Sequence, residues 1–506
     1  MTMKKLFTLF FAASLSLGSY AADFTDSLVV SINNVAMPAQ TSTISVNAQD
    51  NGKYSFLLKD FSFSGMSIGD INLTDVEGNT VNGTTYLRTA QTVTVNLYGA
   101  TMNLPIILRS EIKSNKLYVD MDIAGVPGMT IHATFAGGGD LGGFQIPNSG
   151  FEDYYTYTDH SNIEEPLYWH SFASASGDWA SAVNNTKHTE PSTEVRPGSK
   201  GKMSLKVTST SILGFIANGT VTTGRMNAGS MAAGNTANHA QADMSSTDKD
   251  GHGDPFYVAL NGQPDSLDVW VAFKQAKAKA DHPYATVSAI TTDGTYYQDP
   301  ENKDYTNKRA EARYRKLTTT FSGDKLVWKK LSIPFTEDNK AITPKTILVT
   351  MSTNADAGAG SDGDVLYIDD LSLIYNAPTV KGISFKGQTI TFSSNAATVN
   401  ASGTVSASDF AVETEGALGA QTSISFNTVN NVVVATVIVT SGDYKSFQIY
   451  TVKLPGATAT AIHSVATDNN NAPSELFNLA GQRISNAQPG QVVIVKKGGK
   501  AVKVVK

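Results

Sequence analysis

Two adjacent aspartates, Asp369 and Asp370, interrupt the apolar stretch LYIDDLSL (366–373), which otherwise has the composition of a buried β-strand. Carboxylates in such a strand are costly unless they bind something. A further carboxylate, Glu152, lies in NSGFEDY (148–154). The first and last strands of a β-sandwich can lie side by side, and carboxylates brought together there repel one another unless a hard cation lies between them. Glu152, Asp369 and Asp370 are therefore candidate ligands of a structural calcium ion.

An alternative needs no ion. One aspartate caps a turn or pairs with a lysine, and the other faces water, because neighbouring residues of a strand point to opposite faces. The sequence does not choose between the two aspartates as ligand. A second acidic stretch, SSTDKDGHGDPF (245–256), resembles the start of an EF-hand calcium loop. Counted from Ser246, however, the twelfth residue is Tyr257, whereas such a loop needs a bidentate glutamate at that position. We expect a solvated loop there.

Aromatic residues suggest a second kind of chemistry, the stacking of sugars on aromatic rings beside a few placed polar groups. All four tryptophans lie between residues 142 and 376. In SLDVWVAFK (266–274) strand alternation places Trp270, Asp268 and Lys274 opposite an apolar face. That apolar face consists of Leu267, Val269, Val271 and Phe273. Trp270, Asp268 and Lys274 are therefore candidate ligand-binding residues, unless a loop or a neighbouring domain covers Trp270.

The same alternation applies to KLVWKKLSIPF (325–335) and places Trp328 and Lys330 away from an apolar face. That face is expected to comprise Val327, Leu331, Ile333 and Phe335. Trp328 is thus a further ligand-binding candidate, whereas Trp169 is expected in the core. The tyrosine-rich stretches EDYYTYTDH and DGTYYQDPE are expected to be loops, and Tyr296 and Tyr297 of the second stretch are candidates for a pocket rim.

No residue stands out as catalytic. A glycosidase needs two carboxylates about 5–10 Å apart, and the obvious acids are better explained by a structural ion. The eight histidines do not fall into the spacing of metal ligands or of a catalytic triad. The chain is therefore expected to be non-catalytic, with hydrolysis of carbohydrate left open as an alternative.

The elements that position these residues are expected to be strands. The chain has 506 residues, too many for one ordinary core, and only 17% are charged. Apolar and polar residues alternate, which is typical of an all-β, multidomain protein. There is no cysteine, hence no disulfide and no thiolate metal site. The net charge of −6 is dispersed and provides no basic face for nucleic acid.

The N-terminus resembles an export signal. Lys4 and Lys5 precede an apolar run from Leu6 to Leu17, followed by the small-residue exit Ser19-Tyr20-Ala21. This pattern predicts a Sec signal peptide over residues 1–21 and an exported mature chain. The apolar run is shorter than a bilayer requires, and no later stretch is long enough, so no transmembrane segment is expected in the mature chain.

Glycine- and proline-rich breaks divide the mature chain into segments 22–140, 141–377, 378–456 and 457–506. The first is expected to be an antiparallel barrel, and its stretch GKYSFLLKDFSFSGMSIGDI (52–71) resembles the calycin-like, lipocalin-related domain of Bacteroidetes secreted proteins. Lipocalin-type barrels often bind apolar ligands. This segment is short for a roomy barrel and lacks tryptophan, so a packed interior is expected.

The second segment resembles carbohydrate-binding jelly-roll modules through its motifs IPNSGFEDY, LYWHSF, QPDSLDVWVAFK and YIDDLSLIY. More closely, these motifs resemble the carbohydrate metabolism domain of Bacteroidetes surface proteins. The resemblance implies a jelly-roll β-sandwich with glycan as its partner. It also implies a structural calcium held by Glu152 and by Asp369 or Asp370.

The third segment is expected to be a small Ig-like β-sandwich, with a hairpin at Lys386-Gly387. The tail SELFNLAGQRISNAQPGQVVIVKKGGKAVKVVK (474–506) resembles the C-terminal sorting domain of type IX secretion. That resemblance implies outer-membrane secretion machinery as a partner and a cell-surface or extracellular location. The alternative is a terminal strand pair of the Ig-like segment.

Together these features predict an exported surface protein that binds glycans without catalysis. Two alternatives remain: a carbohydrate-active hydrolase, and a structural or adhesive surface protein whose barrel binds an apolar ligand.

Overall fold

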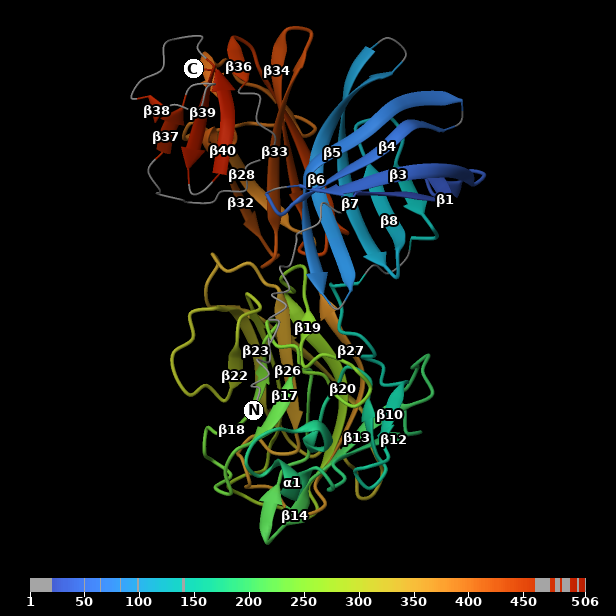
Figure 1. The fold of residues 1–506 in the computed structure, drawn as a ribbon, viewed down its shortest axis with the longest axis vertical. Helices are drawn as coiled ribbons and strands as arrows, with labels where there is room; N and C mark the ends of the chain where they lie inside the picture. The colour runs from blue at the N-terminus through green and yellow to red at the C-terminus, as the bar shows by residue number, and fades with distance from the viewer. Residues whose placement is uncertain are drawn as a thin grey trace, which may run out of the picture.

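A computed structural model represents the protein. It describes residues 21–49, 51–63, 65–81, 83–97, 100–138, 142–459, 474–477, 483–484, 492–497 and 500–505. The predicted signal peptide, except for Ala21, lies outside these residues. Regular structure in the described part is almost entirely β, which confirms the all-β prediction. The barrel and the small C-terminal sandwich lie at one end of the molecule, and the larger sandwich lies at the other (Figure 1).

The N-terminal domain is a closed antiparallel barrel. Its eight strands are β1 (Ala21–Ile32), β3 (Gln40–Ala48), β4 (Tyr54–Phe63), β5 (Met66–Val81), β6 (Thr84–Leu97), β7 (Ala100–Lys113), β8 (Lys116–Ile123) and β9 (Ile131–Phe135). Each pairs with the next, and β9 pairs with β1 to close the barrel; the short β2 (Val35–Ala36) extends β1. Closure leaves no open sheet edge in the wall.

The barrel interior is filled with side chains. On β8, Leu117, Val119, Met121 and Ile123 point inward, as alternation predicts. They join a continuous cluster of buried residues from every strand of the barrel wall, among them Phe56, which is fully buried. The prediction of a packed barrel therefore agrees with the structure, and the structure does not favour the alternative of an apolar ligand inside it.

The central domain, residues 142–377, is called the large sandwich below. One sheet has the order β12 (Thr189–Ser192), β13 (Ser204–Thr208), β27 (Val365–Ile374), β20 (Ser266–Lys274), β24 (Lys329–Pro334). The other has the order β16 (Thr220–Thr222), β26 (Thr346–Ser352), β21 (Ala285–Thr292), β23 (Lys308–Leu317), β25 (Thr336–Glu337), with β19 (Val258–Ala259) also paired to β26. A single apolar cluster from both sheets forms the core.

The core of the large sandwich contains the residues that alternation assigned to it, with one exception. Trp169 is fully buried and packs against the ring of Phe151 at 5.1 Å. Leu331, Ile333 and Phe335 are buried as predicted, but Val327 is 41% exposed, so its prediction was wrong. Val327 precedes the first residue of β24, and strand alternation does not govern residues outside the strand.

The large sandwich also contains several short elements. They are the hairpin β10 (Tyr154–Tyr157) with β11 (Ile163–Pro166), the hairpin β14 (Thr210–Ile212) with β15 (Phe215–Ala217), the sheet of β17 (Arg225–Ala228), β18 (Asn238–Ala242) and β22 (Tyr297–Asp299), the 3-10 turn η1 (Phe172–Ser174), and the helix α1 (Ala180–Val183). The tyrosine-rich stretches expected as loops thus contain β10 and β22, because their aromatic and β-branched residues suit half-buried strands. No helix in the described part of the chain is long and apolar enough to cross a membrane.

Residues 378–459 form the small sandwich. Its sheets contain β28 (Thr379–Phe385), β29 (Gln388–Thr389) and β32 (Phe410–Glu415); β30 (Ala396–Thr398), β33 (Gln421–Val429), β34 (Val432–Thr440) and β35 (Phe447–Leu454); and β31 (Gly403–Val405) with β36 (Ala457–Ala459). The 3-10 turn η2 (Ala407–Asp409) leads into β32. The hairpin predicted at Lys386-Gly387 joins β28 to β29, with both turn residues at positive φ.

The described part of the tail is a four-stranded sheet. Its order is β38 (Arg483–Ile484), β37 (Ser474–Phe477), β39 (Val492–Lys497), β40 (Lys500–Val505). A role for this sheet in sorting stays a prediction.

The barrel contacts the other two domains through β6 and β7. Arg109 on β7 donates to the backbone oxygen of Tyr444 in the small sandwich at 2.5 Å. Around it, Ile107, Phe144 and Ile438 form an apolar cluster with Tyr444 and so join residues of all three domains. The domains are therefore in direct contact rather than separated by free linkers.

The filled barrel predicts a large cost for removing an interior ring. Phe56→Ala should lower the free energy of unfolding of the barrel by about 3–5 kcal/mol, because it leaves a cavity in a packed interior. Lys59→Ala, on the exposed side of the same strand, should change it by less than about 0.5 kcal/mol. Native-state hydrogen exchange of barrel amides measures both. Equal, small effects would indicate a spacious barrel.

Candidate functional site

The strongest candidate site is a groove on the outer face of the five-stranded sheet, at the middle of β20. Alternation along β20 places Leu267, Val269, Val271 and Phe273 in the core with no exposed surface, as predicted. Trp270 and Asp268 therefore lie on the outer face. Trp270 pairs with Lys330 on β24 and with Asp369 on β27, so residues of three strands surround the indole.

The groove has a volume of about 400 Å³. Its lining comprises Arg196, Gly198, Lys200, Asp268, Trp270, Lys330, Asp370, Leu371 and Ser372. We call it the Trp270 groove. Its size is at the lower end of the range for small-molecule pockets, and its combination of one aromatic ring with several charged groups suits a polar ligand.

Two ion pairs cross the Trp270 groove. Lys330 Nζ lies 2.8 Å from Asp268 Oδ2, and the other Asp268 oxygen is buried without a hydrogen-bond partner among the described residues. Arg196 Nε donates to Asp370 Oδ2 at 2.6 Å, and its guanidinium carbon lies 5.4 Å from the centre of the Trp270 ring. This cation–π contact covers part of the indole.

Asp369 lies beneath the groove and is fully buried. Its Oδ2 accepts the backbone N–H of Arg196 at 2.8 Å, and its Oδ1 has no hydrogen-bond partner among the described residues. The pKa of Asp369 is raised to about 6, mainly by burial and also by the neighbouring Asp370 carboxylate, against the lowering effect of the Arg196 N–H. The backbone of Asp370 has φ +41°, outside the range of a regular strand. This irregularity lets the side chains of Asp369 and Asp370 both face the loop that contains Arg196.

The predicted calcium ligands are brought near one another, and protein donors hold them. Leu371 N–H donates to the Ser149 oxygen at 2.9 Å, so the first and last motifs of the domain do lie side by side. Both Glu152 oxygens accept the backbone N–H groups of Lys202 and Met203 at 2.9–3.2 Å.

These contacts fit an ion poorly, because a calcium ion would have to displace the Arg196 side chain from Asp370 and the backbone donors from Glu152. Asp369 Oδ1 is buried and has no hydrogen-bond partner among the described residues. Calcium binding stays a prediction, and no step below depends on it.

The remaining predicted ligand-binding residues lie outside the groove. Lys274 pairs with the exposed Asp324 at 2.6 Å. Trp328 is half-buried and makes an edge contact with Tyr367, 6.5 Å between ring centres, on the same outer face. A role for Trp328 in ligand binding stays a prediction.

Tyr296 and Tyr297 belong to a different part of the domain. Tyr296 is 37% exposed, and its hydroxyl donates to Gln241 at 2.9 Å. Tyr297 is fully buried in an apolar cluster, with its hydroxyl bonded to Glu301 at 2.9 Å. Its prediction as a rim residue was wrong, because β22 begins at Tyr297 and turns neighbouring side chains to opposite faces.

The loop 245–256 is also less solvated than predicted. Asp254 is 5% exposed and accepts the backbone N–H of Tyr168 at 3.1 Å. The Asp250 side chain is likewise 5% exposed and lies beside His170 and Glu165. The prediction of a solvated loop was therefore wrong for these two carboxylates, and sequence spacing had not associated any histidine with them.

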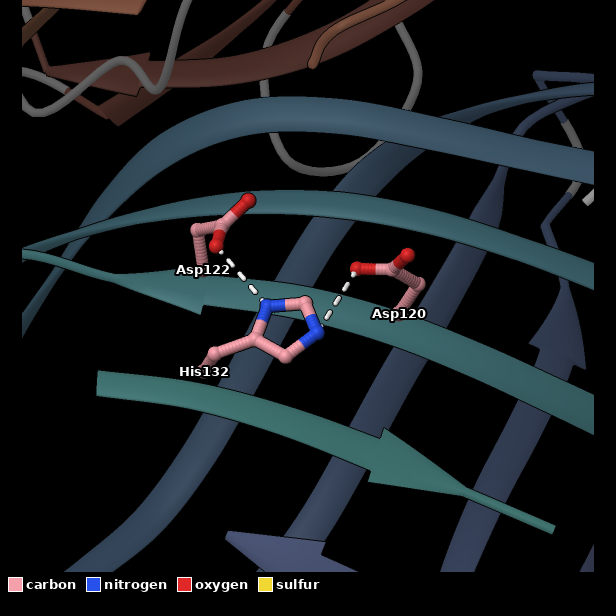
Figure 2. A group of neighbouring side chains, drawn as sticks. All are labelled: Asp120, Asp122 and His132. Carbon is pink, nitrogen blue, oxygen red and sulfur yellow. Dashed lines mark hydrogen bonds and ion pairs between the residues drawn. The ribbon is translucent and has the colours of Figure 1, made fainter. Parts of the chain in front are cut away.

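A second histidine cluster lies on the barrel wall. Figure 2 shows the His132 ring between the carboxylates of Asp122 and Asp120, at 2.9 and 3.5 Å. Arg109 donates to Asp120 at 2.6 Å and supplies a positive charge to the cluster. The hydrogen bond to Asp122 raises the pKa of His132. Because every member has a protein partner, this cluster is an ion-pair network that supports the domain contact at Tyr444.

The sequence did not single out Arg196 and Lys200, which line the groove. Both lie in TEVRPGSK (193–200), a Pro-Gly turn that carries cations. Nothing in the local pattern indicates that this turn folds over the outer face of β20 and β27, because that contact joins residues more than 170 positions apart.

The raised pKa of Asp369 predicts a pH dependence of stability. A carboxyl whose pKa is about 6 in the folded chain, against an ordinary value of 3.8, stabilises the fold when protonated, and that contribution disappears as the pH rises from about 4 to about 6. Asp369→Asn should therefore gain roughly 2–3 kcal/mol relative to wild type across this window. Chemical denaturation at pH 4.5 and 7.5 measures it; a mutant penalty that grows with pH would contradict the assignment.

Comparisons with known proteins cover the barrel best. Residues 21–138 match the model of the calycin-like beta-barrel domain family. No curated protein matches the chain. A solved structure from Bacteroides thetaiotaomicron, described as a "putative glycoside hydrolase", is similar at 14% identity and a TM-score of 0.32, over 53% of this chain and 87% of that chain. Such a distant similarity assigns no activity to this chain. The segment 21–138, the closed barrel of β1 to β9, is thus a calycin-like β-barrel domain.

Proposed function

We propose that the protein binds a glycan in the Trp270 groove and does not cleave it. The observation that carries this proposal is the Trp270 indole at the surface of a sheet, flanked by Arg196, Asp268 and Asp370. Sugars present C–H faces that pack on aromatic rings and hydroxyls that bond to carboxylates and guanidinium groups. The unpartnered oxygen of Asp268 is an acceptor that a sugar hydroxyl would satisfy.

Charge narrows the class of glycan. Arg196, Lys200 and Lys330 bring three positive charges to the groove, against two negative charges from Asp268 and Asp370. Asp369 beneath the groove has a pKa of about 6, so the balance is positive only at lower pH, where Asp369 is protonated. Under those conditions an acidic glycan should be attracted more strongly than a neutral one, and this preference should weaken as salt is added.

The charges also argue against hydrolysis. Glycosidases pair an ionised carboxylate with a protonated one. Asp268 and Asp370 each form an ion pair with a cation of the groove, Lys330 and Arg196, so both carboxylates are already engaged by protein groups. Asp369 has the pKa of a general acid, about 6, and is the one observation in favour of a hydrolase; however, it is fully buried and does not line the groove. We expect no reducing ends on incubation with a bound glycan.

The proposed setting is the cell surface or the medium. It follows from the predicted Sec signal peptide and from the resemblance of the tail to a type IX sorting domain, which would make the outer-membrane secretion machinery a partner. Fractionation of cells expressing the full chain, with and without residues 474–506, tests this part. Retention of both forms inside the cell would count against it.

Calcium can be tested in the same preparation. If the ion binds Glu152, Asp369 or Asp370, then EGTA should lower the melting temperature of the full-length protein, and Glu152→Ala should abolish that difference. An unchanged melting temperature would mean that Arg196 and the backbone donors suffice.

The main prediction concerns Trp270. In a glycan-array screen of the full-length protein, followed by calorimetry with a glycan that binds, Trp270→Ala should weaken affinity at least tenfold, about 1.4 kcal/mol, through loss of the stacking surface. Trp179→Ala is the matched control, since Trp179 is 37% exposed and does not line the groove.

Equal affinity in both variants would show that the glycan-binding site lies outside the groove. Binding of no glycan by folded wild-type protein would favour the structural or adhesive alternative.

A further inference from the structure

Three side chains converge in the interior of the large sandwich, away from the Trp270 groove. They are Glu165 on β11, His170 in the segment that follows, and Asp250 in the loop 245–256. One oxygen from each carboxylate and one ring nitrogen all lie within 4.8 Å of one another. Each side chain is at most 5% exposed.

Glu165 uses only one of its oxygens. Oε1 accepts the backbone N–H and the hydroxyl of Ser171 at 2.6 and 2.5 Å, and the hydroxyl of Ser174 at 3.2 Å. Oε2 is buried and has no hydrogen-bond partner among the described residues. An unsatisfied buried carboxylate oxygen is costly, so a group that binds it stabilises the fold.

The His170 ring is oriented with its Nδ1 atom toward the Asp250 carboxylate. Its Nε2 lies 3.3 Å from the backbone oxygen of Pro255, which can only accept, so Nε2 carries the proton. In the neutral ring Nδ1 then carries the lone pair, and it has no hydrogen-bond partner among the described residues. A backbone carbonyl that fixes the far ring nitrogen is the usual outer contact of a metal-binding histidine.

Asp250 is fixed in a similar way. Its Oδ1 accepts three backbone N–H groups, from His252, Gly253 and Asp254, at 3.0, 2.8 and 2.7 Å. Its Oδ2 lies 3.6 Å from His170 Nδ1. That separation is long for a hydrogen bond and close to the roughly 3.3 Å between two ligands of a tetrahedral zinc ion with bonds of about 2.0 Å.

The charges of the two carboxylates require a cation or a proton. Among the described residues, no lysine or arginine forms an ion pair with Glu165 or Asp250. The barrel cluster differs, because Arg109 supplies a positive charge to Asp120 and Asp122. Two buried carboxylates without such a partner are unfavourable unless a cation or a proton joins them.

We propose that Glu165, His170 and Asp250 bind a divalent transition-metal ion of zinc type. One nitrogen and two oxygen ligands suit zinc, and a water molecule would complete a tetrahedral set. An imidazole ligand makes calcium or magnesium a poor occupant. The ion would tie β11 to the loop 245–256, and because all three ligands are buried we assign it a structural role, although a water completes its coordination. The site is independent of glycan binding and of the predicted calcium ion.

Metal binding by the full-length, tag-free protein tests the proposal. After removal of metals with a chelator, wild type should take up one Zn²⁺ per chain by mass spectrometry of the metal, and its melting temperature should rise on adding Zn²⁺. His170→Gln should lose both effects. His132→Gln, which alters the histidine of the barrel cluster, should keep both.

Glu165→Gln covers the case in which His170→Gln does not fold, because it is isosteric and can still accept from Ser171. It should bind Zn²⁺ at least tenfold more weakly than wild type. Excess Ca²⁺ or Mg²⁺ should not displace the ion. The proposal is overturned if wild type binds no Zn²⁺ at micromolar concentration, or if either variant binds it as tightly as wild type.

Discussion

The contact between Arg196 and the aspartate pair Asp369 and Asp370 organises the outer face of the large sandwich. Two adjacent carboxylates in a strand need partners, and Arg196 meets both through its backbone N–H and its guanidinium group. The contact brings the Pro-Gly turn over the sheet, where it forms one wall of the Trp270 groove. It also places a cation against the indole. The groove therefore depends on the same electrostatic constraint that makes the aspartates conspicuous in the sequence.

In the part of the chain that the structure describes, neither the barrel nor the small sandwich contributes a lining residue to the Trp270 groove. The barrel is packed, and its β6 and β7 face the small sandwich, where Arg109 joins Asp120 and Asp122 to the backbone of Tyr444. Phe144, at the start of the large sandwich, packs into the same contact. The large sandwich is thus held at one end by both neighbours, and the five-stranded sheet that carries the groove extends away from that contact (Figure 1).

Local patterns predicted the strands well and the sites only in part. Period-two alternation placed Leu267, Trp270 and Phe273 on the correct faces, because each decision involves only neighbours in one strand. It failed at Val327, which lies outside β24. Tyr297 was expected in a loop and is instead the first, buried residue of β22. Arg196, His170 and Asp250 were missed for a different reason: their partners are distant in the sequence, and tertiary folding alone brings them together. Adjacent carboxylates predicted a cation, and the guanidinium group of Arg196 lies against one of them, Asp370.

The affinity of Arg196→Ala for a glycan that wild type binds tests the account most directly, with Arg315→Ala, an exposed arginine outside the groove, as the control. Because Arg196 both shapes the wall and offers its guanidinium group to the ligand, the account predicts a loss of at least tenfold for Arg196→Ala and no change for Arg315→Ala. Unchanged affinity in a folded Arg196→Ala protein would contradict the assignment of the Trp270 groove as the binding site.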